Sequence, residues 1–523
     1  MVDLLWILLK IILYLLLALV VYIGYIGFYI PIKARRKYSQ FKNVHVSQKF
    51  IPLLGDAGPY LEDTNNNRAH YDHKRRIEHQ MGPDIDLKLE QLGTTPMLLV
   101  ISHKALKELL SQIPTKIDRF NFDKHKAKRS GFLKTAAGCF VNSPSTKRIL
   151  ERRKNLAKML SLRSVSKHLP IIIKCAEFLL SKMKKQKEVN ITEEITLCTN
   201  RILVSILFGQ DFDKKGEDSY EYVQADGTIT YLDICSYFSK FALEMAEEST
   251  NPLTLFFPIM NITNVVNPWK RNHKNGQSLY RAVKHIIANS QDEDSMWSKI
   301  SKVSDFTDQE ILPDLMILLL AGSETTADNF TSVLYYLKKY PDVKAKLMKE
   351  LEENDITPGC NALEKITVEN IQECDYLSNV VKESLRIDPP LLFSLSYEAY
   401  ADTEICGVPI EKGTVLLQTI IDSNTNHSDW LEPNVFEPER HNPESEFYNE
   451  SKKKEKIQNV YSRRTFGHGP RSCPGMILAT LELKIFTAYF ITQMEYDVAE
   501  EDLSNDHIGF GIGGKFNPKF KIY

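Results

Sequence analysis

The sequence lacks an excess of charge of either sign. Its 523 residues include 66 Lys and Arg against 67 Asp and Glu, for a formal net charge of -1. Because proteins that bind nucleic acid usually carry a basic excess, no nucleic-acid partner is expected. Glycine and proline, at 23 residues each, are too few for a fibrous or low-complexity chain.

Paired cysteines are also missing. The eight cysteines are scattered, and no two are spaced as CxxC. This spacing excludes the usual zinc knuckle and gives no disulfide framework. Scattered free thiols fit a reducing compartment.

Long uncharged runs are rare, with one exception at the amino end. Residues 11–30 carry no charge, and a helix of about 20 residues crosses the ~30 Å hydrocarbon layer of a bilayer. Basic residues follow at once, from Lys33 to Lys37, which places the rest of the chain in the cytosol. A cleaved signal peptide fits less well, because the run is long, its basic flank follows it and no A-x-A site is present. We therefore predict a single-pass anchor over residues 1–31.

The remaining chain shows no break in composition, so we predict a polar linker over 32–81 and one domain over 82–523. The linker contains an exposed stretch at 64–76. The domain is expected to be mainly α with a minor β-sheet. The alternating run 85–92 and the apolar run 96–102 flank Gly93 and predict paired strands.

Helical spacing dominates residues 146–350. A helix over 193–209 is expected to end at its glycine. The longest helix begins at a T-x-x-E capping box, Thr307 and Glu310, and is stopped by Pro341. Short strands are expected at EICGVPI (404–410) and TVLLQTII (414–421), and the last helix should start just after Cys473.

The segment RRTFGHGPRSCPG (463–475) sets one cysteine among glycines, prolines and an arginine. A thiolate is the form of cysteine that binds metal, and a nearby helix amino terminus or cation favours that form. Glycines let the backbone approach a flat partner, and Arg471 could pair with a carboxylate of that partner. These features together describe a seat for haem, whose iron can take an axial cysteine thiolate. The alternative for a lone cysteine in such a segment is an ordinary loop thiol.

This segment resembles the haem loop of the cytochrome P450 superfamily, F-x-x-G-x-R-x-C-x-G. The five matching positions are Phe466, Gly469, Arg471, Cys473 and Gly475. Three further motifs stand in the family's order: AGSETT (321–326), the E-x-x-R pair Glu383 and Arg386, and FEPER (436–440). With the amino-terminal anchor, they resemble the microsomal branch of that superfamily, and no motif identifies a subfamily.

The resemblance implies a role for each motif. Cys473 would be the iron ligand, with Phe466, Gly469, Arg471 and Gly475 around the haem. Thr325, with Glu324 beside it, would deliver protons, and Ala321-Gly322 would let the helix lie against the haem; a plain packing contact is the alternative for these small residues. Glu383 and Arg386 would tie to Arg440 and secure the cysteine loop. Their alternative is a surface ion pair, the default for an i, i+3 spacing.

Two features depart from the family pattern. The early-helix W-x-x-x-R is absent: Ile149 stands four residues before Arg153, so Arg152 or Arg153 is left to meet a haem propionate, unless both belong to a solvated basic face. The proline-rich hinge after the anchor is reduced to Pro52 and Pro59, which leaves the orientation of the domain at the membrane open.

The resemblance further implies haem b as cofactor and monooxygenation of a lipophilic small molecule at the endoplasmic reticulum membrane. Electrons would come from NADPH through a separate NADPH-cytochrome P450 reductase, and cytochrome b5 is a second candidate partner. The basic stretch SKKKEK (451–456), with Arg463 and Arg464, could dock an acidic reductase or simply be a solvated loop. Alternatives are a P450-fold isomerase, lyase or peroxygenase that needs no reductase, and a non-catalytic membrane protein that binds or senses haem.

Overall fold

The computed structural model describes most of the chain. The described residues are 2–47, 50–66, 84–92, 95–122, 124–125, 132–186, 188–210, 212, 218–250, 268–303, 305–456, 459–503, 510–511, 514–515 and 518–523. The turn predicted at Gly93 and most of the stretch predicted to be exposed at 64–76 lie outside them.

Helices make up most of the described structure. The helices are α1 (Val2–Gly24), α2 (Ile30–Tyr38), α3 (Gly58–Asn65), α5 (His103–Ser111), α6 (Phe132–Thr135), α7 (Lys147–Met159), α8 (Leu162–Val165), α9 (Leu169–Met183), α10 (Ile191–Phe208), α11 (Ile234–Thr250), α14 (Trp269–Asn289), α15 (Met296–Val303), α16 (Asp308–Lys339), α17 (Pro341–Glu353), α18 (Ala362–Lys365), α19 (Val368–Glu373), α20 (Asp375–Ile387), α21 (Ile421–Asn424), α22 (Glu446–Lys453), α23 (Met476–Gln493) and α24 (Glu500–Leu503). Shorter helical turns are η1 (Tyr25–Tyr29, a π-helix), η3 (Ser166–His168), η4 (Pro438–His441) and η5 (Gly469–Arg471).

The strands are short. They are β1 (Val44–Val46), β2 (Leu87–Leu92), β3 (Thr95–Val100), β4 (Ile117–Arg119), β5 (Tyr220–Val223), β6 (Ile229–Leu232), β7 (Tyr397–Ala399), β8 (Thr403–Ile405), β9 (Val408–Ile410), β10 (Val415–Gln418), β11 (Tyr496–Val498), β12 (Phe510–Gly511), β13 (Gly514–Lys515) and β14 (Phe520–Ile522). The main sheet has six strands in the order β1-β2-β3-β10-β7-β4, and the others form two-stranded pairs.

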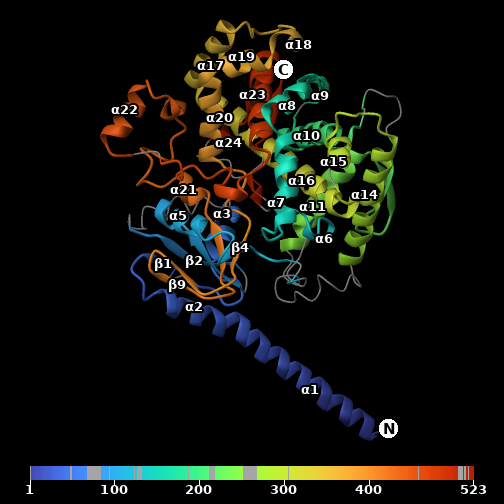
Figure 1. The fold of residues 1–523 in the computed structure, drawn as a ribbon, viewed down its shortest axis with the longest axis vertical. Helices are drawn as coiled ribbons and strands as arrows, with labels where there is room; N and C mark the ends of the chain where they lie inside the picture. The colour runs from blue at the N-terminus through green and yellow to red at the C-terminus, as the bar shows by residue number, and fades with distance from the viewer. Residues whose placement is uncertain are drawn as a thin grey trace.

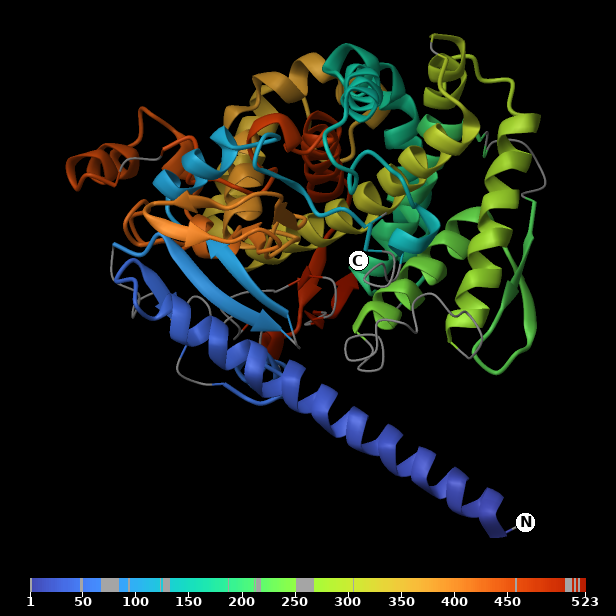
Figure 2. The ribbon, with the colours of Figure 1, turned by 60° about the horizontal axis from the view of Figure 1, so that its bottom comes forward.

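The sheet lies on one side of the domain and the helices on the other, while α1 projects away from both (Figures 1 and 2). The long helix α16 crosses the helical part and packs against α10 and α23. Its facing side chains, such as Leu315, Phe330 and Leu334, are fully buried in the largest core cluster. Burial of these apolar side chains is the main force that holds the helical part together.

Several predictions from local sequence are confirmed. Helix α16 begins at the capping box formed by Thr307 and Glu310, and α17 starts at Pro341. Helix α10 ends at Gly209, whose φ of 75° is the left-handed conformation that glycine tolerates best. Strands β2 and β3 pair antiparallel, as the two alternating runs predicted.

Helices dominate the region 146–350, as predicted, although β5 and β6 form a hairpin beside α14 at the edge of the domain (Figure 2). One prediction of a strand was too simple. The segment EICGVPI is not one strand but the hairpin β8–β9. Cys406 and Gly407 turn it with φ of 52° and 75°, the pair of positive angles found in type I′ turns.

The apolar amino end forms one long helical arm. Within the part of the chain that the structure describes, two helices are long and apolar enough to cross a membrane by length and composition. They are residues Leu5–Tyr38, whose most apolar part is not buried, and α23, which is largely buried in the core. The first arm continues through η1 into α2, past residue 31, so the predicted boundary between anchor and linker falls inside a continuous helix. The division at 31 and 81 stays a prediction.

Candidate functional site

A cavity lies between α16, α10, α23 and the cysteine loop. Most of its wall is apolar, with leucines from α10, α16 and α23: Leu203, Leu207, Leu318, Leu478 and Leu483. The loop 464–475 contributes Phe466, Gly467, Cys473 and Gly475. Four arginines line the cavity: Arg464, which donates to the carbonyls of Val100 and Ile101, and the three cavity arginines Arg119, Arg153 and Arg471.

Helix α16 reaches the cavity with its AGSETT segment. Thr325 lines the cavity, and its hydroxyl donates to the carbonyl of Ala321 at 2.5 Å, the back-bonding expected of threonine in a helix. Gly322 lines the same wall, and a Cβ built there would lie 2.9 Å from Leu203 Cδ1. Gly322 therefore has both of the roles considered for this motif: it allows close packing against Leu203, and it forms part of the cavity wall. Glu324 is half-buried and is not a lining residue.

The cysteine loop is held by its own backbone. The amide of Cys473 donates to the carbonyl of Phe466 at 2.7 Å, and Gly467, at φ of 66°, turns the chain between them. Helix α23 starts at Met476, so the thiol lies at its amino end, as the sequence predicted. Burial raises the pKa of the thiol, although the amides of Gly475 and Met476 and the cation Arg153 pull it down. In the free thiol, the effect of burial on the pKa is larger than the opposing effect of the helix terminus and Arg153.

The predicted glycines and the aromatic have different places. Phe466 and Gly475 face the cavity. Gly469 does not: it has a φ of 74°, and a Cβ there would lie 2.9 Å from Leu110 Cδ2. Glycine is needed at 469 for this turn and for the close approach of Leu110, outside the cavity wall.

The adjacent arginines Arg152 and Arg153 point in different directions and have different partners. Arg153 faces the cavity, where Nε donates to the carbonyl of Pro470 at 3.1 Å and Nη2 to that of Ser472. Arg152 points the other way and donates to the carbonyls of Gly138 and Glu310. Of the two candidates for the propionate contact, Arg153 is therefore the one at the cavity.

The three cavity arginines lack acidic neighbours strong enough to offset their burial. Burial and the cations Arg119 and Arg153 lower the pKa of Arg471 to about 10, and burial also lowers the pKa of Arg119 and Arg153. Arg471 donates mainly to backbone carbonyls, among them Phe140 at 2.7 Å and Ser143 at 3.0 Å. The Arg119 Nε is buried and has no hydrogen-bond partner among the described residues. Clustered, desolvated cations beside an apolar cavity fit a flat apolar ligand that carries carboxylates at one edge, as haem does.

Arg119 was missed by the sequence analysis. It ends strand β4, stacks over the Tyr397 ring at 4.3 Å and donates to the carbonyl of Leu395 at 2.7 Å. No motif surrounds it. Its place at the end of the short buried strand Ile117–Arg119 becomes clear only in the structure.

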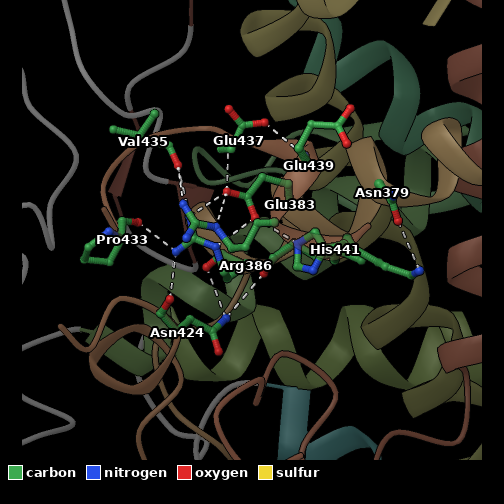
Figure 3. Close-up of polar contacts among 12 residues, drawn as sticks. Asn379, Glu383, Arg386, Asn424, Pro433, Val435, Glu437, Glu439 and His441 are labelled. Atoms are coloured by element: carbon green, nitrogen blue, oxygen red, sulfur yellow. Dashed lines mark hydrogen bonds and ion pairs between the residues drawn. The ribbon is translucent and has the colours of Figure 1, made fainter. Parts of the chain in front are cut away.

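Glu383 is the centre of a buried polar cluster (Figure 3). Its two oxygens accept from Arg386 at 2.7 and 2.9 Å, and one also accepts from Arg440 Nε at 3.1 Å. All three side chains are completely buried, so the alternative of a surface ion pair is wrong. The two arginines hold the carboxyl in its ionised form and keep its pKa well below the usual range despite burial.

His441 is a fourth member that the sequence analysis did not single out. Its Nε2 lies 2.9 Å from Glu383 Oε2, and it follows directly after Arg440 (Figure 3). Burial lowers the pKa of His441 to about 4, so the ring is neutral at pH 7 and donates its Nε2 proton to the carboxylate.

Asn424 connects the Glu383 cluster to the cysteine loop. Its carbonyl accepts from Arg386 Nη1 at 2.8 Å, and its side-chain oxygen accepts from the amide of Arg464 at 2.9 Å. Its Nδ2 donates to Thr465 Oγ1 at 3.0 Å. A continuous set of buried contacts therefore runs from Glu383 to the residue that precedes Phe466.

The cavity wall also contains a buried acid. Glu482 on α23 lines the cavity, is 1 % exposed, and its Oε1 has no hydrogen-bond partner among the described residues. Burial raises its pKa to about 8, so the carboxyl is protonated at neutral pH. No sequence motif marks this glutamate within its apolar helix.

The basic surface predicted ahead of the loop is smaller than expected. Arg464 is fully buried, and its guanidinium donates to the carbonyls of Val100 and Ile101, each at 2.6 Å. Only Arg463 and the lysines 452–454 remain exposed in this region. Arg464 therefore cannot contact a partner protein.

The fold and the cavity describe a mainly helical protein with a single thiol seated beside an apolar, arginine-edged cavity. Residues 75–513 match the family model described as Cytochrome P450. The chain belongs to the cytochrome P450 family, a family of oxidoreductases.

The most similar curated proteins include several cytochromes P450. Cytochrome P450 3A29 of Sus scrofa is 26 % identical over 351 residues, which cover 64 % of each chain, and CYP82J17 of Trigonella foenum-graecum is 24 % identical over 453 residues, 82 % of each. Cytochrome P450 3A9 of Rattus norvegicus is 34 % identical over 192 residues, about a third of either chain. The chain thus spans less than two thirds of the first of these relatives.

Proposed function

We propose that this protein is a membrane-anchored haem-thiolate monooxygenase. It would insert one oxygen atom of O2 into a lipophilic small molecule and release the other as water. The electrons would come from NADPH through a separate reductase. The observation that carries the proposal is the position of Cys473, a thiol open to an apolar cavity at the amino end of α23.

Cys473 would bind the haem iron as a thiolate. The metal would replace the proton, so the raised pKa of the free thiol does not oppose binding. The amides of Gly475 and Met476 would then stabilise the bound sulfur. The haem supplies the chemistry of O2 reduction when it is bound, and a thiolate ligand favours O–O cleavage.

Arg119, Arg153 and Arg471 would hold the two propionates. Charge-assisted hydrogen bonds from guanidinium to carboxylate are among the stronger polar contacts. Binding would also relieve the repulsion among three cations that lie close to one another.

Thr325 would hold a proton-carrying water in the cavity. Its hydroxyl donates to Ala321, so both of its lone pairs remain available to accept from that water. Glu324 would supply protons from the side of α16 away from the lining residues. The apolar wall supports a lipophilic substrate, because burial of its surface would drive binding.

The exposed apolar helix α1 would anchor the protein in the endoplasmic reticulum membrane, with the catalytic domain in the cytosol. The basic residues that follow it support this orientation. The exposed lysines of α22 and Arg463 would steer an acidic reductase to the side of the cysteine loop, with cytochrome b5 as a second donor.

The test is the carbon monoxide difference spectrum of the reduced, membrane-bound protein, compared with Cys473→Ala and with Cys360→Ala as the control. Cys360 is a half-buried cysteine that does not line the cavity. We expect the red-shifted Soret band of a thiolate-bound haem in the wild type and the control, and its loss in Cys473→Ala. A folded wild type without this band would refute the proposal.

Product formation decides between the remaining functions. Turnover that requires NADPH and reductase supports the monooxygenase. Turnover with peroxide or substrate alone would indicate a peroxygenase, isomerase or lyase. Haem binding without substrate-stimulated oxygen uptake would indicate a non-catalytic protein.

A further inference from the structure

The arm that carries the membrane anchor joins the domain without a hinge. Helix α1 passes through the π-helical turn Tyr25–Tyr29 into α2. Pro31 lacks the amide proton that would bond to Gly27, and a π-helical turn is a known way to accommodate such a defect without breaking the helix. The arm therefore stays helical to Tyr38, where a family member would be expected to have a proline-rich hinge.

Helix α2 is clamped to the domain by one buried ion pair. Arg35 Nη2 lies 2.8 Å from Asp56 Oδ1 and 2.9 Å from Oδ2, and the two side chains are 14 % and 9 % exposed. Asp56 is itself fastened to strand β2, because Gln91 donates its amide to Asp56 Oδ2 at 2.9 Å and accepts from the Asp56 amide at 2.6 Å. Arg35 also donates to the carbonyl of Ser47 at 2.5 Å. The clamp thus joins the arm to the main sheet.

The turn just before Asp56 touches the arm within its uncharged run. Residues Ile51–Gly55 form a tight turn closed by hydrogen bonds between Ile51 and Gly55. A Cβ built on Gly27 would lie 2.6 Å from Leu53 Cδ2, so the helix and the turn are in direct contact at Gly27. Gly27 precedes Lys33, the first basic residue after the uncharged run 11–30, by roughly 9 Å of helix.

This contact sets the depth of the turn relative to a bilayer. Residues 4–21, in which Lys10 is the single charged residue, extend roughly 27 Å, close to the thickness of the hydrocarbon layer. Tyr22, Tyr25 and Tyr29 then follow, and tyrosines of this kind gather where a bilayer meets water. Because Leu53 contacts Gly27, between Tyr25 and Tyr29, the turn lies at that interface.

The exposed side chains of the turn suit this environment. Ile51 is 41 % and Leu54 is 42 % exposed, Pro52 is also exposed, and Ile51–Gly55 contains no charged residue. The next charge, Asp56, is buried in the clamp. In water this apolar turn would be unfavourable, whereas at the edge of a bilayer its exposed area is removed from water.

We propose that the amino-terminal helix is a rigid arm, clamped by Arg35 and Asp56, and that the turn Ile51–Gly55 enters the interface of a phospholipid bilayer beside it. The domain then has two membrane contacts and one orientation. This inference rests on the membrane anchoring in the proposed function and is independent of the haem chemistry.

The first experiment measures the depth of the turn. Leu54→Trp is placed in the full-length protein in phosphatidylcholine nanodiscs, with and without bromine on the lipid chains near the headgroup. The control is Lys452→Trp on α22, which is exposed and lies far from the arm (Figures 1 and 2). We expect the added fluorescence of Leu54→Trp to be quenched by the brominated lipid and that of Lys452→Trp to be unaffected.

The native Trp6 on α1 separates the two ways in which this experiment could fail. Quenching in the wild type that is lost in Trp6→Phe reports Trp6, since Trp269 and Trp430 are buried in the domain and Trp297 is half-buried. If the wild type is not quenched, the membrane anchor itself is refuted. If the wild type is quenched but Leu54→Trp adds no quenched signal, the turn does not meet the bilayer and the inference falls.

The second experiment tests the clamp by trypsin, which cuts at the basic residues 33–37 only where the helix opens. Asp56→Asn and Arg35→Lys weaken the clamp and keep every basic site. Glu411→Gln is the control, because its ion pair with Lys37 on the same helix is solvent-exposed. Trypsin also has sites at 68–76, so cleavage within 33–37 is identified by the amino-terminal sequence of the released domain. We expect several-fold faster cleavage within 33–37 for the first two variants and no change for the control. Equal cleavage within 33–37 in all four proteins, each with an unchanged circular dichroism spectrum, would show a hinge in place of a clamp.

Discussion

Arg152 on α7 and Asp314 on α16 form an ion pair in the interior, with Nε 3.3 Å from Oδ2 and side-chain exposures of 3 % and 0 %. One turn earlier on both helices, Arg148 pairs with Glu310 at 2.8 Å. The two ion pairs connect α7 to α16 at successive helical turns. The next residue on α7, Arg153, points away from these pairs and towards the cavity. This arrangement gives adjacent arginines different tasks, one that holds α7 to α16 and one at the cavity.

Loss of Arg152 should destabilise the fold more than loss of Arg153. Arg152→Ala leaves the buried Asp314 without its cation, and breaking a buried pair costs roughly 3–5 kcal/mol. Urea unfolding at pH 7 measures this effect. Arg153→Ala is expected to keep the unfolding free energy but to lose haem more readily to an apo-globin acceptor. The same loss of stability in both variants would contradict the division of tasks.

Asp314 should also make the Arg152→Ala variant sensitive to pH. Burial raises the pKa of Asp314 to about 7 in the folded state, above 3.8 in the unfolded state. The folded protein therefore binds more protons between pH 4 and 7, and this group's contribution to stability falls as pH rises through that range. Without Arg152 the folded pKa rises further, so the fall extends to higher pH. Unfolding curves at pH 5 and pH 8 measure the difference, and Arg148→Ala, whose side chain is partly exposed, is the control.

Glu482 should show the same sign of pH dependence in the apo-protein. Its folded pKa of about 8 lies above the 4.5 of an unfolded glutamate, so its contribution is present at low pH and is lost as pH rises towards 8. Glu482→Gln removes the ionisation and keeps the shape. We expect the variant to gain stability relative to wild type as pH is raised from 5 to 8. A constant difference across this range would show that Glu482 does not change its protonation on unfolding.

Asn424 should connect the stability of the Glu383 cluster with the thiolate bond. Asn424→Ala leaves the buried amide of Arg464 unpaired, at a cost of about 1–3 kcal/mol. Because this amide precedes the cysteine loop, we expect faster conversion of the reduced carbon monoxide complex to the form that has lost its thiolate. Thr465→Val removes the contact with Asn424 Nδ2 and the hydrogen bond to the Leu385 carbonyl but leaves the Arg464 amide paired, and it should have a smaller effect. Identical conversion rates in Asn424→Ala and wild type would show that the loop is held without this residue.

Thr325 should control how much of the consumed NADPH appears as product. Thr325→Val removes the hydroxyl, and loss of one group that helps transfer a proton lowers such a step by up to ~10²-fold. We expect less product and more hydrogen peroxide for each NADPH oxidised. Thr331→Val is the matched control on the same helix, because Thr331 back-bonds to Ala327 at 2.9 Å but does not line the cavity. Equal yields from both variants would remove Thr325 from the proposed mechanism.

Local patterns predicted much of this protein because they act over a few residues. The capping box at Thr307, the left-handed glycine at 209 and the alternation in β2 and β3 depend on nearest neighbours along the chain. The cysteine loop is also local, since its tight backbone requires glycines at set positions. The hairpin β8–β9 was missed although its turn is local too, because Cys406 is an uncommon residue at a positive φ.

The sequence by itself determined the helical class, the apolar amino-terminal arm, the position of Cys473 before the last long helix and the family resemblance. Only the tertiary structure decided which arginines face the cavity, that Arg464 is buried, that Asn424 and His441 join Glu383, and that α2 is clamped to the sheet. The reason is physical: an arginine in a chain has the same charge wherever it stands, but burial and the partners brought from distant segments set what that charge does. Arg35 and Asp56 are an ordinary basic and an ordinary acidic residue in the sequence, and they become a clamp because the sheet removes both from water.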